Sequence, residues 1–82
     1  MIIKARRKSV LVEAEQFFAI NPTVLGIEVE LIQGNYYIDI EEDGDVYNQR
    51  IINGCWLTRL NDRIEVVSEI DFYKNYEQFN VI

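Results

Sequence analysis

The sequence contains no histidine, and it has only one cysteine and one proline among its 82 residues. Without histidine the chain lacks the usual general base at neutral pH, the commonest zinc ligand, and the partner that activates a serine or cysteine nucleophile. The lone Cys55 cannot close a disulfide within the chain and has no companions for a zinc site, so we expect it to be buried and inert. We therefore predict a protein that is not an enzyme, with no catalytic residues, no metal and no cofactor.

Long apolar runs are also missing. No stretch approaches the roughly 20 apolar residues that span a bilayer, and the basic start of the chain is not followed by an apolar signal region. Hydrophobic residues make up 49% of the chain, while Gly and Pro together number five, which is the balance of a folded protein. A chain of this length has room for one core, so we predict a single domain over residues 1–82, in a reducing cytoplasm and with no membrane partner.

Charge is distributed unevenly along the chain. Residues 1–8 carry a net charge of +4 from Lys4, Arg6, Arg7 and Lys8, whereas all fourteen acidic residues lie in residues 9–82, which carry −10. An acidic body repels nucleic acid, so we do not expect a nucleic-acid partner, although a basic tip can bind a phosphate or a carboxylate. Arg6, Arg7 and Lys8 are therefore candidate ligand contacts. The alternative is that this basic segment is a sheet edge whose charges discourage the addition of another strand.

Most of the chain shows the alternation of short β-strands. Strands are expected over residues 9–18, 28–32, 36–40, 46–52, 55–60 and 63–67, with turns at Gln33-Gly34, Asp43-Gly44, Asn53-Gly54 and Asn61-Asp62. Turns this short imply antiparallel pairing, because parallel strands need long crossovers. The sequence thus predicts an α+β fold in which a meander of about five antiparallel strands is covered on one face by a short C-terminal helix.

The helix is expected to begin at Ser68, which is followed by acidic residues and by aromatic residues at helical spacing. Strand alternation and helical spacing together predict the core: Val10, Val12, Val29, Leu31, Ile38, Ile40, Trp56, Ile64, Val66, Phe72, Tyr76 and Phe79. Further apolar residues exceed what this core needs: Leu11, Phe17, Phe18, Ile32, Tyr37, Tyr47 and Leu57. Pairing of edge strands or stacking of sheet faces between copies would cover such surface, so we predict a homodimer or a small higher oligomer.

Two groups of acidic residues are candidates for a metal site or a catalytic site. Residues 41–45 gather carboxylates around Gly44, but they lack the ligand spacing of an EF-hand and are better explained as a solvated hairpin turn. Glu13 and Glu15 project from the same face of one strand, about 7 Å apart, and could act as the pair of carboxylates that catalyses glycoside hydrolysis. A small sheet has little wall for the cleft that this chemistry needs, so an exposed sheet face is the expected setting, with Glu13, Glu15, Tyr37 and Tyr47 as possible partner contacts.

Residues 5–16, Ala-Arg-Arg-Lys-Ser-Val-Leu-Val-Glu-Ala-Glu-Gln, resemble the opening of a family of small uncharacterised bacteriophage and prophage proteins. Gly54-Cys55-Trp56 and residues 71–77 resemble that family's Gly-Asp-Trp turn and its closing aromatic segment. Ser9 stands where the family has proline, Cys55 stands where it has aspartate, and the family's Gly-Glu hairpin is missing between Leu60 and Ser68. The resemblance implies a phage gene product acting in the bacterial host cytoplasm, and it brings no established catalytic residues.

These observations favour a non-enzymatic phage protein that binds a host or phage macromolecule, for example by inhibiting a host enzyme or a defence system. The alternative is an oligomeric protein that binds or sequesters a nucleotide, with the basic residues on the phosphates and an aromatic ring on the base. A hydrolase that works through carboxylates and a metal ranks third, because carboxylates are the only plausible metal ligands available.

Overall fold

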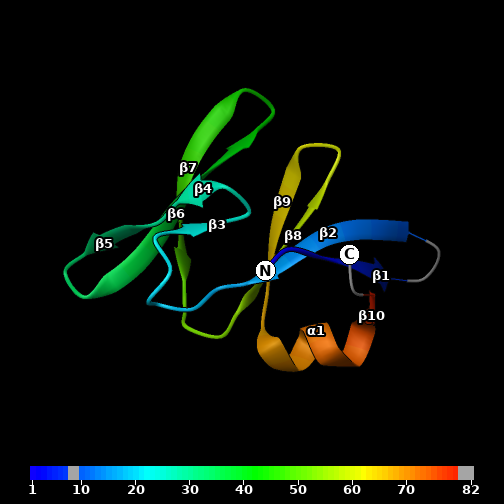
Figure 1. Ribbon diagram of the computed structural model, residues 1–82. Helices are drawn as coiled ribbons and strands as arrows, with labels where there is room; N and C mark the ends of the chain where they lie inside the picture. The colour runs from blue at the N-terminus through cyan, green and yellow to red at the C-terminus, as the bar shows by residue number, and fades with distance from the viewer. Residues whose placement is uncertain (8–9, 80–82) are drawn as a thin grey trace.

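The computed structural model describes residues 1–7 and 10–79, and it is mostly antiparallel β-sheet with one short helix near the C-terminus. The largest sheet has five strands in the order β10-β1-β2-β8-β9 (Figure 1). These strands are β1 (Ile3–Arg7), β2 (Val10–Gln16), β8 (Trp56–Leu60), β9 (Arg63–Val67) and β10 (Glu77–Phe79). Between β2 and β8 the chain builds a small hairpin of β3 (Thr23–Val24) and β4 (Ile27–Glu28), and a sheet of β5 (Glu30–Ile32), β6 (Asn35–Glu42) and β7 (Asp45–Ile51).

The expected single meander is therefore wrong. The chain leaves the five-stranded sheet after β2, forms two other sheets, and returns with β8 beside β2. Strand β8 explains this arrangement, because Trp56, Leu57 and Thr58 are all buried although successive residues point to opposite faces. A strand buried on both faces needs a layer on each side, and one helix supplies only one of them.

Four hairpins close with two-residue turns in which both central residues have positive φ: Leu25-Gly26, Gln33-Gly34, Asp43-Gly44 and Asn61-Asp62. This is the type I′ geometry that matches the twist of paired strands. The type I′ turn predicted at Asn53-Gly54 is wrong, because of these two residues only Gly54 has positive φ. Here the chain crosses between sheets, and the Gly54 N–H donates to the Phe17 carbonyl over 2.8 Å.

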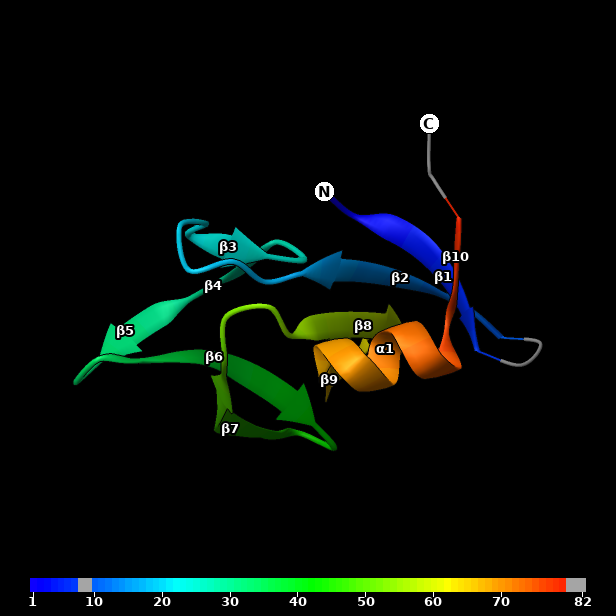
Figure 2. The same cartoon turned by 90° about the horizontal axis from the view of Figure 1, so that it is seen from below.

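Two hydrophobic clusters lie on opposite faces of the five-stranded sheet. The first joins this sheet to the β3–β4 hairpin and the β5–β6–β7 sheet, and contains Phe17, Val24, Leu25, Ile38, Ile40, Ile51, Cys55 and Leu57. The second lies under helix α1 (Glu69–Asn75) and contains Ile3, Ala5, Val12, Ala14, Trp56 and Phe72. Figure 2 shows α1 running alongside β8, where the Trp56 and Phe72 rings stack with centroids 3.9 Å apart. Cys55 and Trp56, which are neighbours in sequence, thus belong to different clusters.

The predicted core is confirmed for most of its residues and wrong for Val10 and Leu31. Val12, Ile38, Ile40, Trp56 and Phe72 are buried, and Val29, Ile64, Val66 and Tyr76 pack against the clusters. Val10 and Leu31 are exposed, because Val10 begins β2 beyond the reach of the helix and Leu31 belongs to the short edge strand β5, all of whose residues are exposed. Phe17 and Leu57 were expected to add surface, but both are fully buried by the second layer.

The C-terminal helix begins at the predicted position, but it is shorter than predicted. The Ser68 hydroxyl caps it by accepting from the Asp71 N–H over 3.2 Å. The helix ends at Asn75, and the following residues pair with β1 as strand β10, so the placement of Phe79 on the helix is wrong and its side chain lies outside the described residues. Strand β1 consequently has a neighbour on each side, which also overturns the reading of the basic segment as a sheet edge. No helix in the described part of the chain is long and apolar enough to cross a membrane.

Candidate functional site

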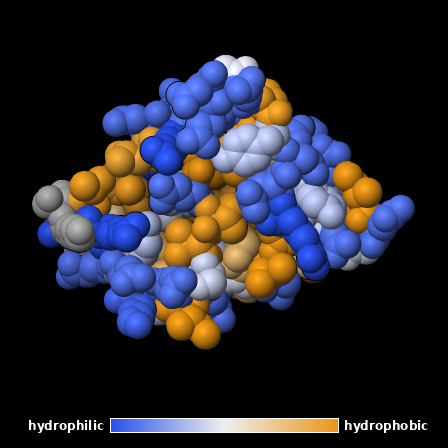
Figure 3. Space-filling view, turned by 180° about the vertical axis from the view of Figure 1, so that it is seen from behind, coloured by the Kyte–Doolittle hydropathy of each residue, from blue (hydrophilic) through white to orange (hydrophobic). Residues whose placement is uncertain are grey.

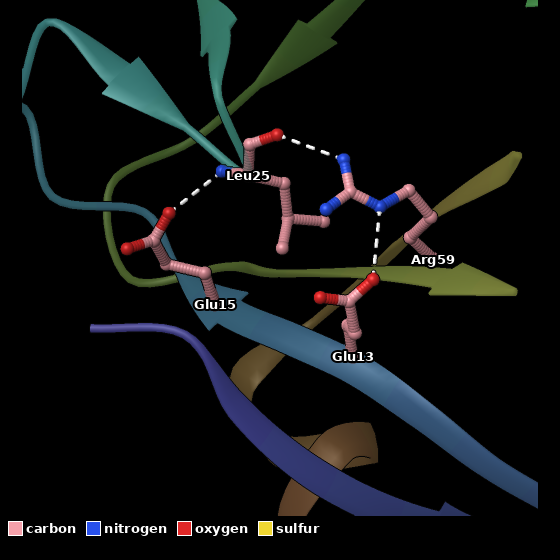
Figure 4. A network of polar contacts seen from close by, with 4 residues as sticks. All are labelled: Glu13, Glu15, Leu25 and Arg59. Atoms are coloured by element: carbon pink, nitrogen blue, oxygen red, sulfur yellow. Dashed lines mark hydrogen bonds and ion pairs between the residues drawn. The ribbon is translucent and has the colours of Figure 1, made fainter. Parts of the chain in front are cut away.

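Glu13 and Glu15 hold the β3–β4 hairpin onto the five-stranded sheet. Glu15 Oε1 accepts from the Leu25 N–H over 2.6 Å, and Arg59 Nη1 donates to the Leu25 carbonyl over 3.0 Å (Figure 4). Arg59 Nε in turn lies 3.3 Å from Glu13 Oε1. The terminal amine of Met1 lies 3.0 Å from the other oxygen of Glu15.

The expectation of an exposed acidic face is wrong for Glu15, which the hairpin covers, whereas the Glu13 side chain is still 37% exposed. The Glu15 side chain is only 17% exposed, and both of its oxygens have partners. A carboxylate held by a backbone N–H and a cation is a structural anchor in this fold. Among the described residues, no group of three or more His, Cys, Asp or Glu side chains is placed to hold a metal ion.

The other candidate residues do not converge on one site. Arg6 and Arg7 are successive residues of β1, so they project from opposite faces of the sheet, and Lys8 lies outside the described residues. Tyr47 on β7 donates to Glu42 Oε2 over 3.1 Å, and this hydrogen bond to a carboxylate raises the pKa of Tyr47. Tyr37 lies half-buried on β6, opposite Arg50 of β7.

Of these candidates, Arg7 lines the groove that the structure leaves open beside helix α1. We call this the sheet-face groove: a cavity of about 300 Å³ on the helix-side face of the five-stranded sheet. It is lined by Arg7, Val10, Val12, Thr58, Leu60, Arg63, Glu65 and Tyr76. Val10 and Leu60 are each 42% exposed, so apolar side chains of this groove are open to water.

The groove exists because the helix is too short to cover the face. Seven residues of α-helix span about 10 Å, and α1 packs over Ile3, Ala14 and Trp56 before the chain turns into β10. The far ends of β1, β2, β8 and β9 receive no cover from it. Alternation along each strand assigns Val10 and Leu60 to a face of that strand. Predicting the groove also requires knowing which strands are neighbours and where the helix ends, and the sequence pattern does not reveal either.

Two arginines flank the groove. The Arg7 guanidinium carbon lies 6.0 Å from the centre of the Tyr76 ring, a distance at which a cation is attracted to an aromatic face. Arg63 lies 3.7 Å from Glu42 and 3.8 Å from Glu65, but these exposed pairs contribute little and leave the guanidinium able to exchange partners. The arrangement suits a ligand with an apolar body and acidic groups beside it.

Comparison of the chain with models of protein families, with curated proteins and with solved structures gives no match. The function must accordingly be argued from the groove, the strand edges and the charges themselves.

Proposed function

We propose that this chain is a non-enzymatic binding protein, encoded by a phage or prophage, that engages a host or phage protein through the sheet-face groove. The observation that carries the proposal is the partly covered sheet face, where α1 leaves Val10 and Leu60 open to water between Arg7 and Arg63. Exposed apolar surface with a charged rim is typical of protein interaction sites. The phage origin rests on the resemblance of residues 5–16, 54–56 and 71–77 to that family.

The charge distribution defines the partner's chemistry. The whole chain has a net charge of −6, whereas the groove lining contains two arginines and one glutamate, Glu65, so the groove is a local positive site in an acidic protein. A partner segment that fits carries an apolar side chain for the floor and carboxylates for the guanidinium groups. Bidentate pairing of Arg with a carboxylate would orient the segment across the strands.

The test compares the two faces of the same pair of strands. Arg7 and Val10 face each other across β1 and β2 on the groove side, and Arg6 and Leu11 form the neighbouring pair on the opposite side. We expect Arg7→Glu and Val10→Asp to abolish recovery of the partner from infected-cell lysate. The matched variants Arg6→Glu and Leu11→Asp should keep that recovery, with circular dichroism as the check on folding. Equal recovery with all four variants would place the binding surface elsewhere.

A second candidate is a small anionic ligand such as a nucleotide, favoured by the two arginines that flank a cavity of about 300 Å³. Tyr76 is a poor platform for a base, because its ring already stacks on Phe72 at 4.8 Å. Thermal shift of the purified protein with nucleotides separates the candidates. A rise in melting temperature that Arg7→Glu removes would favour the nucleotide.

A further inference from the structure

Strand β9 has an open edge. Within the described residues β9 pairs only with β8, and its five residues run in continuous register without glycine, proline or a bulge. The two-residue turn makes Leu60 and Arg63 a hydrogen-bonded pair. Along β9, residues whose backbone groups bond to β8 then alternate with residues whose backbone groups do not. The backbone groups of Ile64 and Val66 therefore point away from β8, and neither residue makes any of the backbone bonds found outside the strand ladders.

A hollow lies beside this edge on each face of the sheet, although β6 also packs against β9 on the face away from the helix. The sheet-face groove lies on the helix side of β9, and a second hollow lies on the other side, between β9 and the β6–β7 hairpin. Arg63 and Glu65 line both hollows. Seen from behind, the molecule presents apolar side chains near the centre of the view, with hydrophilic residues around them (Figure 3). These hollows leave room for an additional strand beside residues 63–66 of β9.

The other sheet edges are less suited to accept a strand. Strands β5 and β10 are each only three residues long, which is one of the ways in which proteins protect an edge. Strand β7 has seven residues, but an antiparallel copy centred on Asn48 would set Val46 against Arg50 and Tyr47 against Gln49, which gives no ion pair. Charge complementarity thus favours β9 over β7.

We infer that two copies of this chain associate through antiparallel pairing of their β9 strands, centred on Ile64. In this register Ile64 faces Ile64 of the second copy as a hydrogen-bonded pair, and Arg63 of each copy faces Glu65 of the other. Two ion pairs form across the interface by symmetry, one on each side of the two-fold axis. The next register, centred on Glu65, would set two carboxylates directly opposite each other and is disfavoured.

This pairing has a consequence for the groove. Arg63 and Glu65 belong to the helix-side face in both copies, and residues paired across antiparallel strands lie on the same face. The two five-stranded sheets thus continue into one another, and the two sheet-face grooves open on one side of the combined sheet. The inference itself does not depend on the proposed function, because it requires only the purified chain.

The test uses charge reversal at the two exposed positions. Arg63→Glu replaces both ion pairs by pairs of glutamates, and Glu65→Arg replaces both by pairs of arginines. We expect each single variant to weaken dimerisation about tenfold or more in light scattering coupled to size exclusion. An equimolar mixture of the two variants should form a heterodimer, because every glutamate then faces an arginine. The double variant R63E/E65R should likewise recover the dimer.

Matched controls carry the same charge changes away from β9. Lys74→Glu on α1 and Glu28→Arg on β4 alter exposed residues by the same charge, and both should keep the wild-type dimer. A wild-type protein that stays at the mass of one chain up to about 1 mM would overturn the inference. So would a dimer that both single variants leave intact, or a loss in both variants that mixing and the double variant fail to restore.

Discussion

At the scale of single residues, Trp56 is a central packing residue on the helix side. Its ring is 5% exposed, stacks on Phe72, and meets Tyr73 edge to face at 6.0 Å. Its indole Nε1 is buried without a hydrogen-bond partner among the described residues. A buried donor left unpaired costs about 1–3 kcal/mol, so this side chain combines a large packing gain with a local penalty.

The two contributions of Trp56 can be separated by two substitutions. Trp56→Ala leaves a cavity and should lower the free energy of unfolding by roughly 3–5 kcal/mol. Trp56→Phe keeps most of the ring stack and removes the unpaired donor, so it should cost less than half as much. Urea unfolding followed by circular dichroism measures both. Equal losses in the two variants would contradict the role assigned to the unpaired nitrogen.

Cys55 gives the protein a specific sensitivity to alkaline conditions. Burial raises the pKa of its thiol above the ordinary value of 9.0, because the thiolate is poorly solvated in the first cluster. The native chain therefore holds this proton to higher pH than the unfolded chain. The corresponding stability is complete below pH 9.0 and is lost as the pH rises through the folded-state pKa.

We expect the wild type to lose more stability than Cys55→Ala between pH 8 and pH 10.5, since only the wild type has a thiol to ionise. Melting temperatures of both proteins across this range provide the measurement, and the tyrosines and lysines that they share cancel in the difference. Parallel pH profiles would show that Cys55 makes no such contribution.

At the scale of elements, the β3–β4 hairpin is the piece most dependent on a few polar contacts. Each of its strands is only two residues long, and hairpins of that size do not persist alone. Leu25 at its turn inserts into the first cluster, with its N–H on Glu15 and its carbonyl on Arg59. The hairpin is thus held in place by its contacts with the five-stranded sheet and the first cluster.

Removing one of these contacts should release the hairpin locally. Glu15→Ala deletes a charge-assisted bond and should lower the free energy of unfolding by about 1.5–3 kcal/mol. Amide exchange at Leu25 should then accelerate far more than exchange in β8, because the hairpin opens before the sheet does. Glu28→Ala, at the exposed residue of β4, serves as the control and should leave Leu25 protected. Unchanged exchange at Leu25 in Glu15→Ala would reject the anchoring role.

At the scale of the whole molecule, β8 connects the two clusters. Leu57 points into the first cluster and Trp56 into the second, so the two layers share one strand. A chain of 82 residues buries too little surface for two independently stable cores, which favours a single cooperative transition.

This coupling predicts an effect across the sheet. Leu57→Ala should destabilise the fold by about 2–5 kcal/mol, and the transition seen by Trp56 fluorescence should shift as far as the one seen by far-ultraviolet circular dichroism. The fluorescence probe lies on the opposite face from the substitution. A shift confined to circular dichroism, with Trp56 fluorescence unchanged, would mean that the two layers unfold separately.

The sequence by itself determined the local structure. Turn residues and alternation predicted the hairpins around Gln33-Gly34, Asp43-Gly44 and Asn61-Asp62, and the Ser68 cap, because these features depend on φ preferences and on contacts within a few residues. The same information placed Ile38, Ile40 and Trp56 in the core.

Only the tertiary structure decided which strands are neighbours and which faces are covered. The sequence does not show that β8 returns to β2, that residues 77–79 pair with β1, or that a hairpin covers Glu15. It therefore could not show the sheet-face groove or the open edge of β9. The physical reason is that alternation tells which residues share a face of one strand, while burial depends on pairings between segments up to 75 residues apart, such as Lys4 with Phe79.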